Sequence, residues 1–360
     1  MNPDGAGCFT HGSGARAHCD TGMNDRQARA NGTVGLGVAR MDPAVPARED
    51  GVAQKRPRGV LALGWACFES AAHGRTEHRP TSADYPESVV RRTSFIAGGG
   101  LGWRISMLTT PRERPTPWKI VVVTGAPSWA EYWAPALAAL PQTREMVVVD
   151  RPGFAASEPF DCVPDIAAQA RALAPILQAA PGQKILLVGQ SYGAAIATLM
   201  AAAQPRRVAG LVLLSSYLGE PGPTTRWLVT MGSRFLNLIP RDLRNAVMEI
   251  SNQNGQLALI AEALPKLRSP VHVIHGDLDD FAPLEVAERL AREARTRRPV
   301  RFERVSGANH FFNDGPVATL LGCLETAIAA SEPNRGLRAP ALPRFRWRLG
   351  KTLSTQTATA

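Results

Sequence analysis

The sequence predicts an α/β fold with a mostly parallel central sheet, helices on both faces, an antiparallel hairpin at one edge and an inserted helical cap. From about residue 88 to residue 331, short apolar runs alternate with longer segments of helical periodicity. Continuous apolar runs are typical of parallel strands that are buried on both faces. One segment of about 50 residues interrupts the alternation and is too long for a simple crossover.

The first two predicted strands, at 88–97 and 101–109, are joined by Gly98-Gly99-Gly100 and should form the hairpin. At the start of the helix that is predicted at 128–140, Ser128 and Glu131 have the spacing of a capping box. The remaining alternation predicts a strand at 118–124, a helix at 128–140, a strand at 145–150, a helix at 165–180, a strand at 184–188, a helix at 192–204, a strand at 208–215, a strand at 271–275, a helix at 284–295, a strand at 300–305 and a helix at 316–330.

The long segment at about 217–269 is predicted to be a small helical cap. Its apolar residues either pack within the cap or line the mouth of a pocket, and Trp129, Tyr132 and Trp133 present the same alternative. If such residues line a pocket, the substrate has an apolar acyl or aromatic portion. The cap residues concerned are Trp227, Leu228, Met231, Phe235, Leu236, Leu238 and Ile239.

The two ends of the chain differ from the region between them. Residues 1–86 show no sustained periodicity, so they are predicted to be a disordered extension or sequence upstream of the true start, with Met23 and Met41 as alternative starts. Residues 332–360 are predicted to be a flexible basic tail. The formal net charge is +10, and half of it lies in these last 29 residues. The domain at 87–331 is therefore not expected to bind nucleic acid.

No uncharged apolar run approaches the roughly 18 residues of a transmembrane helix, and we expect a cytoplasmic protein. Export is the alternative, because 59–68 is a short apolar stretch after basic residues and 91–95 resembles a twin-arginine signal. The tail segment at 344–348 alternates arginine with aromatic residues. It is either solvated or makes weak contact with an anionic membrane surface.

The motif Gly189-Gln190-Ser191-Tyr192-Gly193 lies between a predicted strand and an Ala-rich helix. A tight strand–nucleophile–helix turn requires residues without side chains two positions before and two after the nucleophile, and glycine occupies both. Such a turn projects the hydroxyl beyond the carboxyl edge of the sheet, where open α/β sheets bind ligands. Ser191 is therefore predicted to be a nucleophile, and the alternative is a Gly-rich turn with an idle serine.

A serine hydroxyl needs a neighbouring base. Four of the seven histidines precede residue 87, and His272 and His275 lie three apart on one predicted strand, which points them to opposite faces. His310 follows the last predicted strand in a loop that can reach the edge above Ser191. His310 is therefore the predicted base.

The acid that orients the histidine is expected after the strand at 271–275. Asp277, Asp279 and Asp280 all follow that strand, and chemistry alone does not separate them. The oxyanion hole requires backbone N–H groups. One is expected from Tyr192, directly after the nucleophile, and the other from Ala126, because Pro127 has no N–H.

The region from about residue 88 to residue 330 resembles an α/β-hydrolase domain. Thr124-Gly125-Ala126-Pro127 resembles the family's His-Gly oxyanion loop, and the run from Asp150 to Ser157 resembles its D-x-P-G-x-G-x-S turn. The spacing Gly276-x-x-Asp279-x-x-x-Pro283 resembles the acid loop, and this resemblance favours Asp279 over its neighbours. The sequence departs from the family pattern at Thr124, Gln190 and Ala155.

The resemblance and the three polar groups predict a serine hydrolase with Ser191, Asp279 and His310 as its catalytic triad. We expect it to cleave a carboxylic ester or related acyl bond of a small, partly apolar substrate through an acyl-enzyme. The alternatives are a C–C bond hydrolase or acyltransferase with the same triad, or a ligand-binding protein without catalysis. The five cysteines include no C-x-x-C pair, and neither a metal nor a cofactor is predicted.

Overall fold

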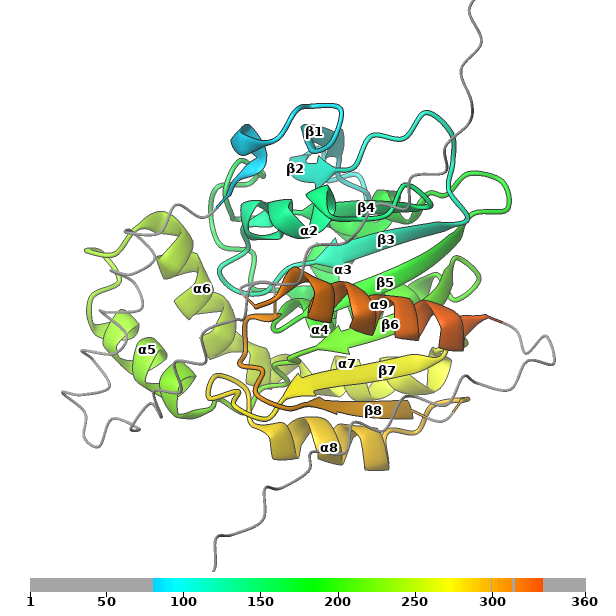
Figure 1. The fold of residues 1–360 in the computed structure, drawn as a ribbon. Helices are drawn as coiled ribbons and strands as arrows, with labels where there is room; N and C mark the ends of the chain where they lie inside the picture. The colour runs from blue at the N-terminus through cyan, green and yellow to red at the C-terminus, as the bar shows by residue number, and fades with distance from the viewer. Residues whose placement is uncertain (1–79, 299, 313–314, 333–360) are drawn as a thin grey trace, which may run out of the picture. The chain divides into compact units, whose positions relative to one another are not determined.

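The computed structural model describes residues 80–298, 300–312 and 315–332, and Figure 1 shows the domain that they form. The predicted N-terminal extension lies outside the described residues up to residue 79, and the basic tail lies outside them from residue 333. The predictions for the apolar stretch at 59–68 and for membrane contact at 344–348 therefore stay predictions.

In the described part of the chain, the strands form one eight-stranded sheet in the order β1-β2-β4-β3-β5-β6-β7-β8. Neighbours from β4 to β8 pair in parallel, whereas β1–β2 and β2–β4 are antiparallel, which confirms the predicted architecture. The strands are β1 (Arg91–Ile96), β2 (Arg104–Thr109), β3 (Trp118–Val123), β4 (Arg144–Val149), β5 (Lys184–Gln190), β6 (Val208–Leu214), β7 (Val271–Gly276) and β8 (Val300–Val305).

The central strands are buried on both faces. Val121 and Val123 of β3 belong to the apolar core on one side of the sheet, and Ile120 and Val122 belong to the core on the other. Successive side chains of a strand face opposite sides, so a strand between two cores needs an apolar residue at every position. This is why the continuous apolar runs predicted the parallel sheet.

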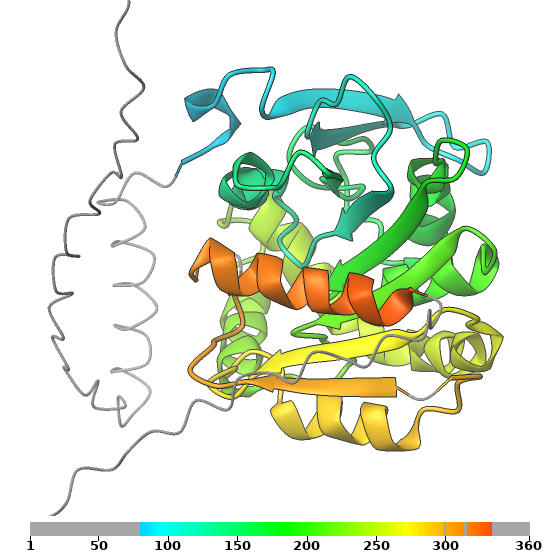
Figure 2. The same cartoon turned by 45° about the vertical axis from the view of Figure 1, so that its right-hand side comes forward.

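Helices form layers on both faces of the sheet, and Figure 2 shows α9 crossing one face. α2 and α9 contribute to the core on that face, whereas α3, α4, α7 and α8 contribute to the core on the other. None of the described helices is long and apolar enough to cross a membrane. The bounds are α2 (Ala134–Ala138), α3 (Ile166–Leu173), α4 (Gly193–Ala203), α7 (Leu257–Ala263), α8 (Leu284–Glu293) and α9 (Val317–Ser331).

The helix predicted after β3 is shorter than expected, because a 3-10 turn, η2 (Ala130–Trp133), precedes the five-residue α2. The predicted capping box is also wrong. The Ser128 hydroxyl accepts a hydrogen bond from the Arg151 N–H at 2.9 Å, and Glu131 forms an ion pair with Arg92 at 2.7 Å. Both side chains are thus engaged by distant segments and not by the helix that they were expected to cap.

Edge strand β1 contains the residues at 91–95 that resemble a twin-arginine signal. Arg92 forms an ion pair with the buried Asp150 at 2.6 Å, so this arginine fastens β1 to the end of β4. A 3-10 turn, η1 (Ser82–Asp84), donates a backbone N–H to the Glu131 carboxylate at 2.6 Å. Ser82, which precedes the predicted domain start at residue 87, is therefore bonded to the domain.

The segment between β6 and β7 has two parts. Its first two helices pack on each other and lie off the ends of the parallel strands in Figure 1. From α7 onward the segment instead packs on α4, and Ile260 and Leu264 join the core of the sheet domain. The predicted cap at about 217–269 thus includes residues that cover the sheet. Besides α7, the segment contains α5 (Pro223–Arg234), α6 (Arg241–Asn252), η4 (Gln253–Gln256) and η5 (Leu264–Lys266).

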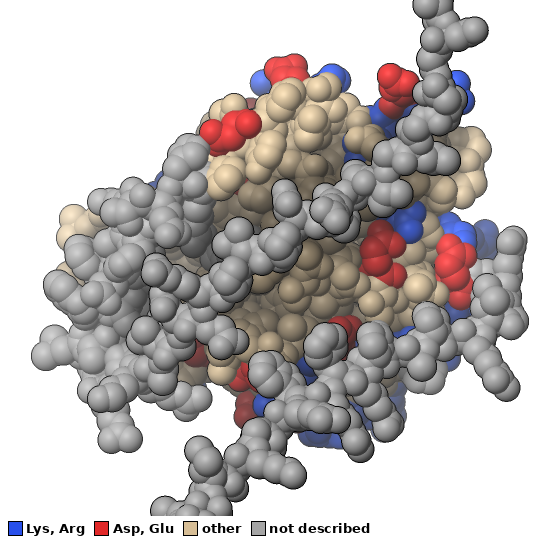
Figure 3. Space-filling model, in the orientation of Figure 1, with Lys and Arg blue, Asp and Glu red and all other residues tan. Residues whose placement is uncertain are grey.

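Acidic and basic side chains lie side by side on the face of the molecule in Figure 3. Two of the ion pairs of the described residues tie α9 and the residue after it to the sheet, Arg144–Glu325 at 2.8 Å and Lys184–Glu332 at 2.6 Å. Exposed pairs of this kind contribute only about 0–1 kcal/mol each to stability. The two apolar cores therefore contribute most of the stability of this domain.

Candidate active site

The turn between β5 and α4 carries Ser191 at the carboxyl end of the sheet. Ser191 has φ 51, a left-handed conformation that residues with a side chain rarely adopt. Its N–H donates to Leu214 O of the neighbouring strand β6 at 2.9 Å, and its own carbonyl accepts hydrogen bonds from Ala194 and Tyr217. These bonds hold a strained turn in place, as a sharply projected hydroxyl requires.

The glycines on either side of Ser191 allow the turn to close. A Cβ atom on Gly189 would lie 2.6 Å from Ala194 Cα, and one on Gly193 would collide with the carbonyl oxygens of Val123 and Thr124. We expect Gly193→Ala to lower the free energy of unfolding by about 3 kcal/mol, measured by denaturant titration, because backbone atoms cannot yield as side chains can.

The control for this substitution is Gly322→Ala on the exposed side of α9, where an added Cβ meets nothing within 4 Å. It should be neutral or stabilise the protein by up to about 1 kcal/mol, since alanine is the better helix former. Equal stability of the two variants would show that the close approach at Gly193 does not constrain the turn.

His310 lies in the loop after β8 and reaches Ser191. Its Nε2 is 2.9 Å from Ser191 Oγ, and its Nδ1 is 2.8 Å from Asp279 Oδ2. The imidazole stacks on Phe281, with ring centroids 5.0 Å apart, and meets the ring of Phe311 edge-on at 5.1 Å. These contacts fix the plane of a histidine that is only 5% exposed.

The acid loop after β7 separates the three candidate aspartates. Asp279 alone of the three contacts His310, and its Oδ1 also accepts the N–H groups of Phe281 and Ala282 at 3.0 and 2.9 Å. The other two are engaged elsewhere: Asp277 accepts the Gly307 N–H at 2.7 Å, and Asp280 accepts the Thr224 hydroxyl at 2.7 Å.

The surroundings of Asp279 favour its ionised form. Burial by itself would raise the pKa of Asp279, but the hydrogen bonds from His275 and His310, the charge of His310 and the Ala282 N–H outweigh it, and the pKa is well below the ordinary value of 3.8. An anion is therefore available beside His310 at neutral pH, where it can stabilise a protonated imidazole.

His275 is a member of this cluster that the sequence analysis missed. Its Nε2 lies 3.2 Å from Asp279 Oδ2 and 3.0 Å from Ala282 O, which identifies Nε2 as the protonated nitrogen because a carbonyl oxygen only accepts. The carboxylate thus lies between two imidazoles. The available signal was the position of His275 directly before Gly276, four residues from Asp279 in the acid loop.

The loop after β3 lies beside Ser191. A Cβ atom on Gly125 would lie 2.9 Å from Ser191 Cβ, so glycine permits this approach. Among the described residues, neither the Ala126 N–H nor the Tyr192 N–H donates a hydrogen bond to another backbone group outside helices and strands. Both predicted oxyanion donors therefore belong to segments that flank Ser191, and neither is engaged in a turn.

Two of the departures from the family pattern have structural partners. Thr124 donates its hydroxyl hydrogen to Val149 O at 3.0 Å and makes a short hydrogen bond with Ser128. The Gln190 side chain accepts the indole N–H of Trp133 at 3.1 Å, and Trp133 is buried in the core. Ala155 has φ 47, so the chain retains there the conformation that the family's glycine adopts freely.

The described residues contain no group of three or more His, Cys, Asp and Glu side chains that could hold a metal ion. Their two cysteines, Cys162 and Cys323, are free thiols. Burial raises the pKa of each thiol to about 12, so neither is a thiolate at neutral pH. The side chains in the hydrogen-bonded chain that starts at the Ser191 hydroxyl are the His310 imidazole and the Asp279 carboxylate.

The mostly parallel sheet carries Ser191 in the turn after β5, Asp279 in the loop after β7 and His310 in the loop after β8, which is the arrangement expected of an α/β-hydrolase fold. The family model described as alpha/beta hydrolase fold matches residues 119–247. The chain therefore has the α/β-hydrolase fold, as its motifs predicted. No curated protein sequence matches it significantly.

Solved structures with this fold are similar to the chain at low sequence identity. A bacterial membrane phospholipase A is 18% identical, with a TM-score of 0.51 over 75% of this chain and 98% of that one. A 2-hydroxy-6-oxo-6-phenylhexa-2,4-dienoate hydrolase from Rhodococcus sp. strain RHA1 is 18% identical, with a TM-score of 0.51 over 67% and 99%. A haloalkane dehalogenase from Agrobacterium tumefaciens C58 is 17% identical, with a TM-score of 0.50 over 67% and 97%. These proteins are named for different reactions, so the likeness shows the fold alone.

Proposed function

We propose that the protein is a serine hydrolase that cleaves a carboxylic ester, or a related acyl bond, of a small and partly apolar substrate. The observation that carries the proposal is one hydrogen-bonded chain of side chains. Ser191 Oγ lies 2.9 Å from His310 Nε2, and His310 Nδ1 lies 2.8 Å from Asp279 Oδ2. This is the order of nucleophile, base and orienting acid that acyl transfer requires.

In the proposed first step, Ser191 Oγ attacks the carbonyl carbon of the substrate while its proton passes to His310 Nε2. The carbonyl oxygen becomes an oxyanion and is bound by the N–H groups of Ala126 and Tyr192. Collapse of this intermediate breaks the bond to the leaving alcohol, which takes the proton from Nε2. An acyl group is then bonded to Ser191, and the alcohol can leave.

In the second step, His310 Nε2 takes a proton from water, and the resulting hydroxide attacks the acyl carbonyl. The proton returns to Ser191 Oγ when the acid product leaves. Asp279 stays ionised throughout, since its pKa is well below its ordinary value, and it stabilises the imidazolium in both steps. Proton transfer by a positioned group typically contributes about 10²–10⁴-fold to the rate.

The position of helices α5 and α6 and their exposed apolar residues support the proposal that the substrate is partly apolar. The start of α5 is joined to the acid loop by Thr224, whose hydroxyl donates to Asp280 at 2.7 Å. α6 is joined to the opposite side of the site by the ion pair between Arg151 and Glu249 at 2.8 Å. The two helices therefore flank the catalytic residues. They and the turn between them expose large apolar side chains, namely Leu228, Phe235, Leu238, Leu243 and Met248.

The proposal is tested with a fluorophosphonate probe and a panel of p-nitrophenyl esters of graded chain length. We expect covalent labelling at Ser191, located by peptide mass spectrometry, and turnover that rises with chain length before it falls. Folded protein that is neither labelled nor active on any ester would favour a ligand-binding protein. Labelling without ester turnover would instead favour C–C bond hydrolysis or acyl transfer by the same residues.

A further inference from the structure

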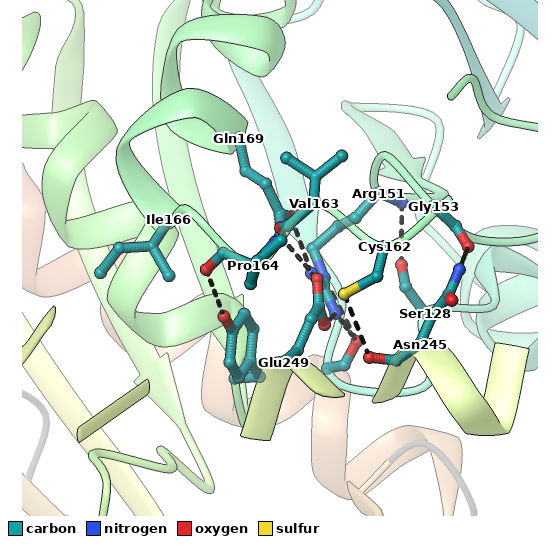
Figure 4. Close-up of polar contacts among 12 residues, drawn as sticks. Ser128, Arg151, Gly153, Cys162, Val163, Pro164, Ile166, Gln169, Asn245 and Glu249 are labelled. Atoms are coloured by element: carbon teal, nitrogen blue, oxygen red, sulfur yellow. Dashed lines mark hydrogen bonds and ion pairs between the residues drawn. The ribbon is translucent and has the colours of Figure 1, made fainter. Parts of the chain in front are cut away.

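Arg151 is fully buried and bonds to residues from several segments of the chain (Figure 4). Arg151 follows β4, and its Nε and Nη2 donate to the carbonyl oxygens of Thr124 and Gly125 at 2.9 and 2.7 Å. Its other N–H groups bond to the side chains of Glu249 and Gln169. All five guanidinium donors therefore have acceptors, two of them in the loop backbone.

Glu249 of α6 supplies the matching charge. Its two oxygens each accept a hydrogen bond from a different Nη atom of Arg151 at 2.8 Å, and Gln169 Nε2 donates to Oε1 at 2.5 Å. Both side chains of the ion pair are 0% exposed. A bidentate pair fixes the plane of the guanidinium as well as its position, so Glu249 determines where Arg151 can present its remaining donors.

The Gly125 carbonyl and the Ala126 N–H belong to the same peptide unit. This unit is trans, since the cis peptide bonds of the described residues are Ala126–Pro127 and Glu158–Pro159. A planar trans unit points its C=O and N–H in opposite directions. Because Arg151 holds the Gly125 oxygen on its own side, the Ala126 N–H must point away from the guanidinium.

Arg151 also contacts the residue that carries the other N–H. The centre of its guanidinium lies 4.9 Å from the centroid of the Tyr192 ring. The Tyr192 side chain is fully buried. One cation thus touches the backbone of the first donor segment and the side chain of the second. Stability alone does not explain this arrangement, because well-packed apolar residues are often as stabilising as a buried ion pair.

We propose that Glu249, acting through Arg151, is a positioning residue that sets the direction of the Ala126 N–H and makes helix α6 part of the support of the oxyanion hole. This inference rests on the proposed function, in which that N–H binds the developing oxyanion. Without the charge of Glu249, the plane of the Arg151 guanidinium is no longer fixed. The peptide unit between Gly125 and Ala126 is then free to rotate, and the Ala126 N–H changes direction.

The chain offers a matched control on the same helix. Asn245 of α6 is also buried, and its Nδ2 donates to Gly153 O at 2.7 Å and Phe160 O at 3.1 Å. These hydrogen bonds attach α6 to the sheet domain, but Asn245 makes no hydrogen bond to Arg151 or to the loop at 124–128. Removing them therefore tests whether weaker attachment of α6 is by itself enough to lower catalysis.

The experiment compares Glu249→Gln and Asn245→Ala with the full-length wild type, at a temperature at which thermal melting shows each protein folded. For Glu249→Gln we expect kcat on a p-nitrophenyl ester to fall about 100-fold, as when one oxyanion donor is lost, with KM within about threefold. Asn245→Ala should keep kcat within about threefold of the wild-type value, even if its melting temperature falls as much as that of Glu249→Gln. Should Glu249→Gln not fold, Arg151→Lys replaces it, because lysine keeps a cation beside Glu249 but cannot span both loop carbonyls.

Amide hydrogen exchange of the peptide containing residues 124–128 gives a readout that needs no substrate. We expect faster exchange in Glu249→Gln than in wild type, and no change in Asn245→Ala. Unchanged exchange together with unchanged kcat in folded Glu249→Gln overturns the positioning role and leaves the proposed function standing. If wild type itself neither labels nor turns over esters, the proposed function fails, and with it the catalytic purpose of the positioning. The exchange comparison then decides only whether Glu249 holds the loop.

Discussion

Replacing Ser191 by alanine should lower kcat for any ester that the wild type cleaves by about 10⁴- to 10⁶-fold, while KM changes little. The Ser191 hydroxyl lies 2.9 Å from His310 Nε2, and alanine removes it without adding bulk. The residual rate comes from binding and from the oxyanion donors, which the substitution leaves in place. Steady-state kinetics with p-nitrophenyl esters measure both constants.

Ser251→Ala is the control for this experiment. The Ser251 hydroxyl on α6 donates to Val247 O of its own helix at 2.7 Å, so its hydrogen bond is made away from the triad. Its loss should change kcat by less than about twofold, since surface substitutions away from a site have small effects. Turnover by Ser191→Ala equal to that of wild type would refute Ser191 as the nucleophile, whatever the other residues do.

The sheet was predictable from the sequence because a strand that is buried on both faces is a continuous run of apolar residues. Val121, Val122 and Val123 must all be apolar when alternate side chains enter two cores. The helix after β3 was not predictable in detail. Ser128 and Glu131 have capping spacing, but they bond to Arg151 and Arg92, which local sequence cannot reveal.

Different parts of the site differed in how far local sequence could predict them. Glycine at 189 and 193 is a steric requirement of the turn, so the motif pointed to Ser191 on physical grounds. The three aspartates after β7 were chemically equivalent in sequence. Only the family resemblance of the loop spacing favoured Asp279, and the structure gives the physical reason: Asp277 bonds to Gly307 and Asp280 to Thr224, whereas Asp279 faces His310.

The buried network behind the site had no local signature. Arg151 and Glu249 are 98 positions apart, and a glutamate in a helix of mixed polarity predicts a solvated side chain. Only the folded chain shows that this glutamate is fully buried against a cation. His275 was set aside for a similar reason, because strand periodicity gives the face of a side chain but not its partner.

Replacing Asp279 by asparagine should lower kcat by about 10⁴-fold with little change in KM. Asparagine has nearly the same shape, but it is neutral and its amide group can face His310 Nδ1 with either atom. The imidazolium that forms in each step then loses its counterion, and the tautomer with a free Nε2 is no longer enforced. The measurement is kcat and KM on the ester that the wild type prefers.

Asp277→Asn and Asp280→Asn are matched controls from the same loop. Each removes one carboxylate charge close to the site, but neither residue makes a hydrogen bond to His310. We expect each variant to keep kcat within about threefold of the wild-type value, because a nearby charge without a hydrogen bond to the base is largely screened. A loss in either control as large as in Asp279→Asn would show that the loop charge matters and not the specific contact.

The pH dependence of stability gives a second, independent measure of the same carboxylate. Burial opposes ionisation of Asp279, but its hydrogen bonds outweigh burial and hold its pKa in the folded protein well below the ordinary value of 3.8. A group with a lowered pKa stabilises the fold above its unfolded pKa and loses this contribution as the pH falls through its folded pKa. The difference in free energy of unfolding between wild type and Asp279→Asn should therefore be largest near pH 7 and shrink below about pH 4. Denaturant titrations between pH 3 and pH 8 measure it. A difference that stays constant over this range would mean that the ionised carboxylate is not held by the two imidazoles.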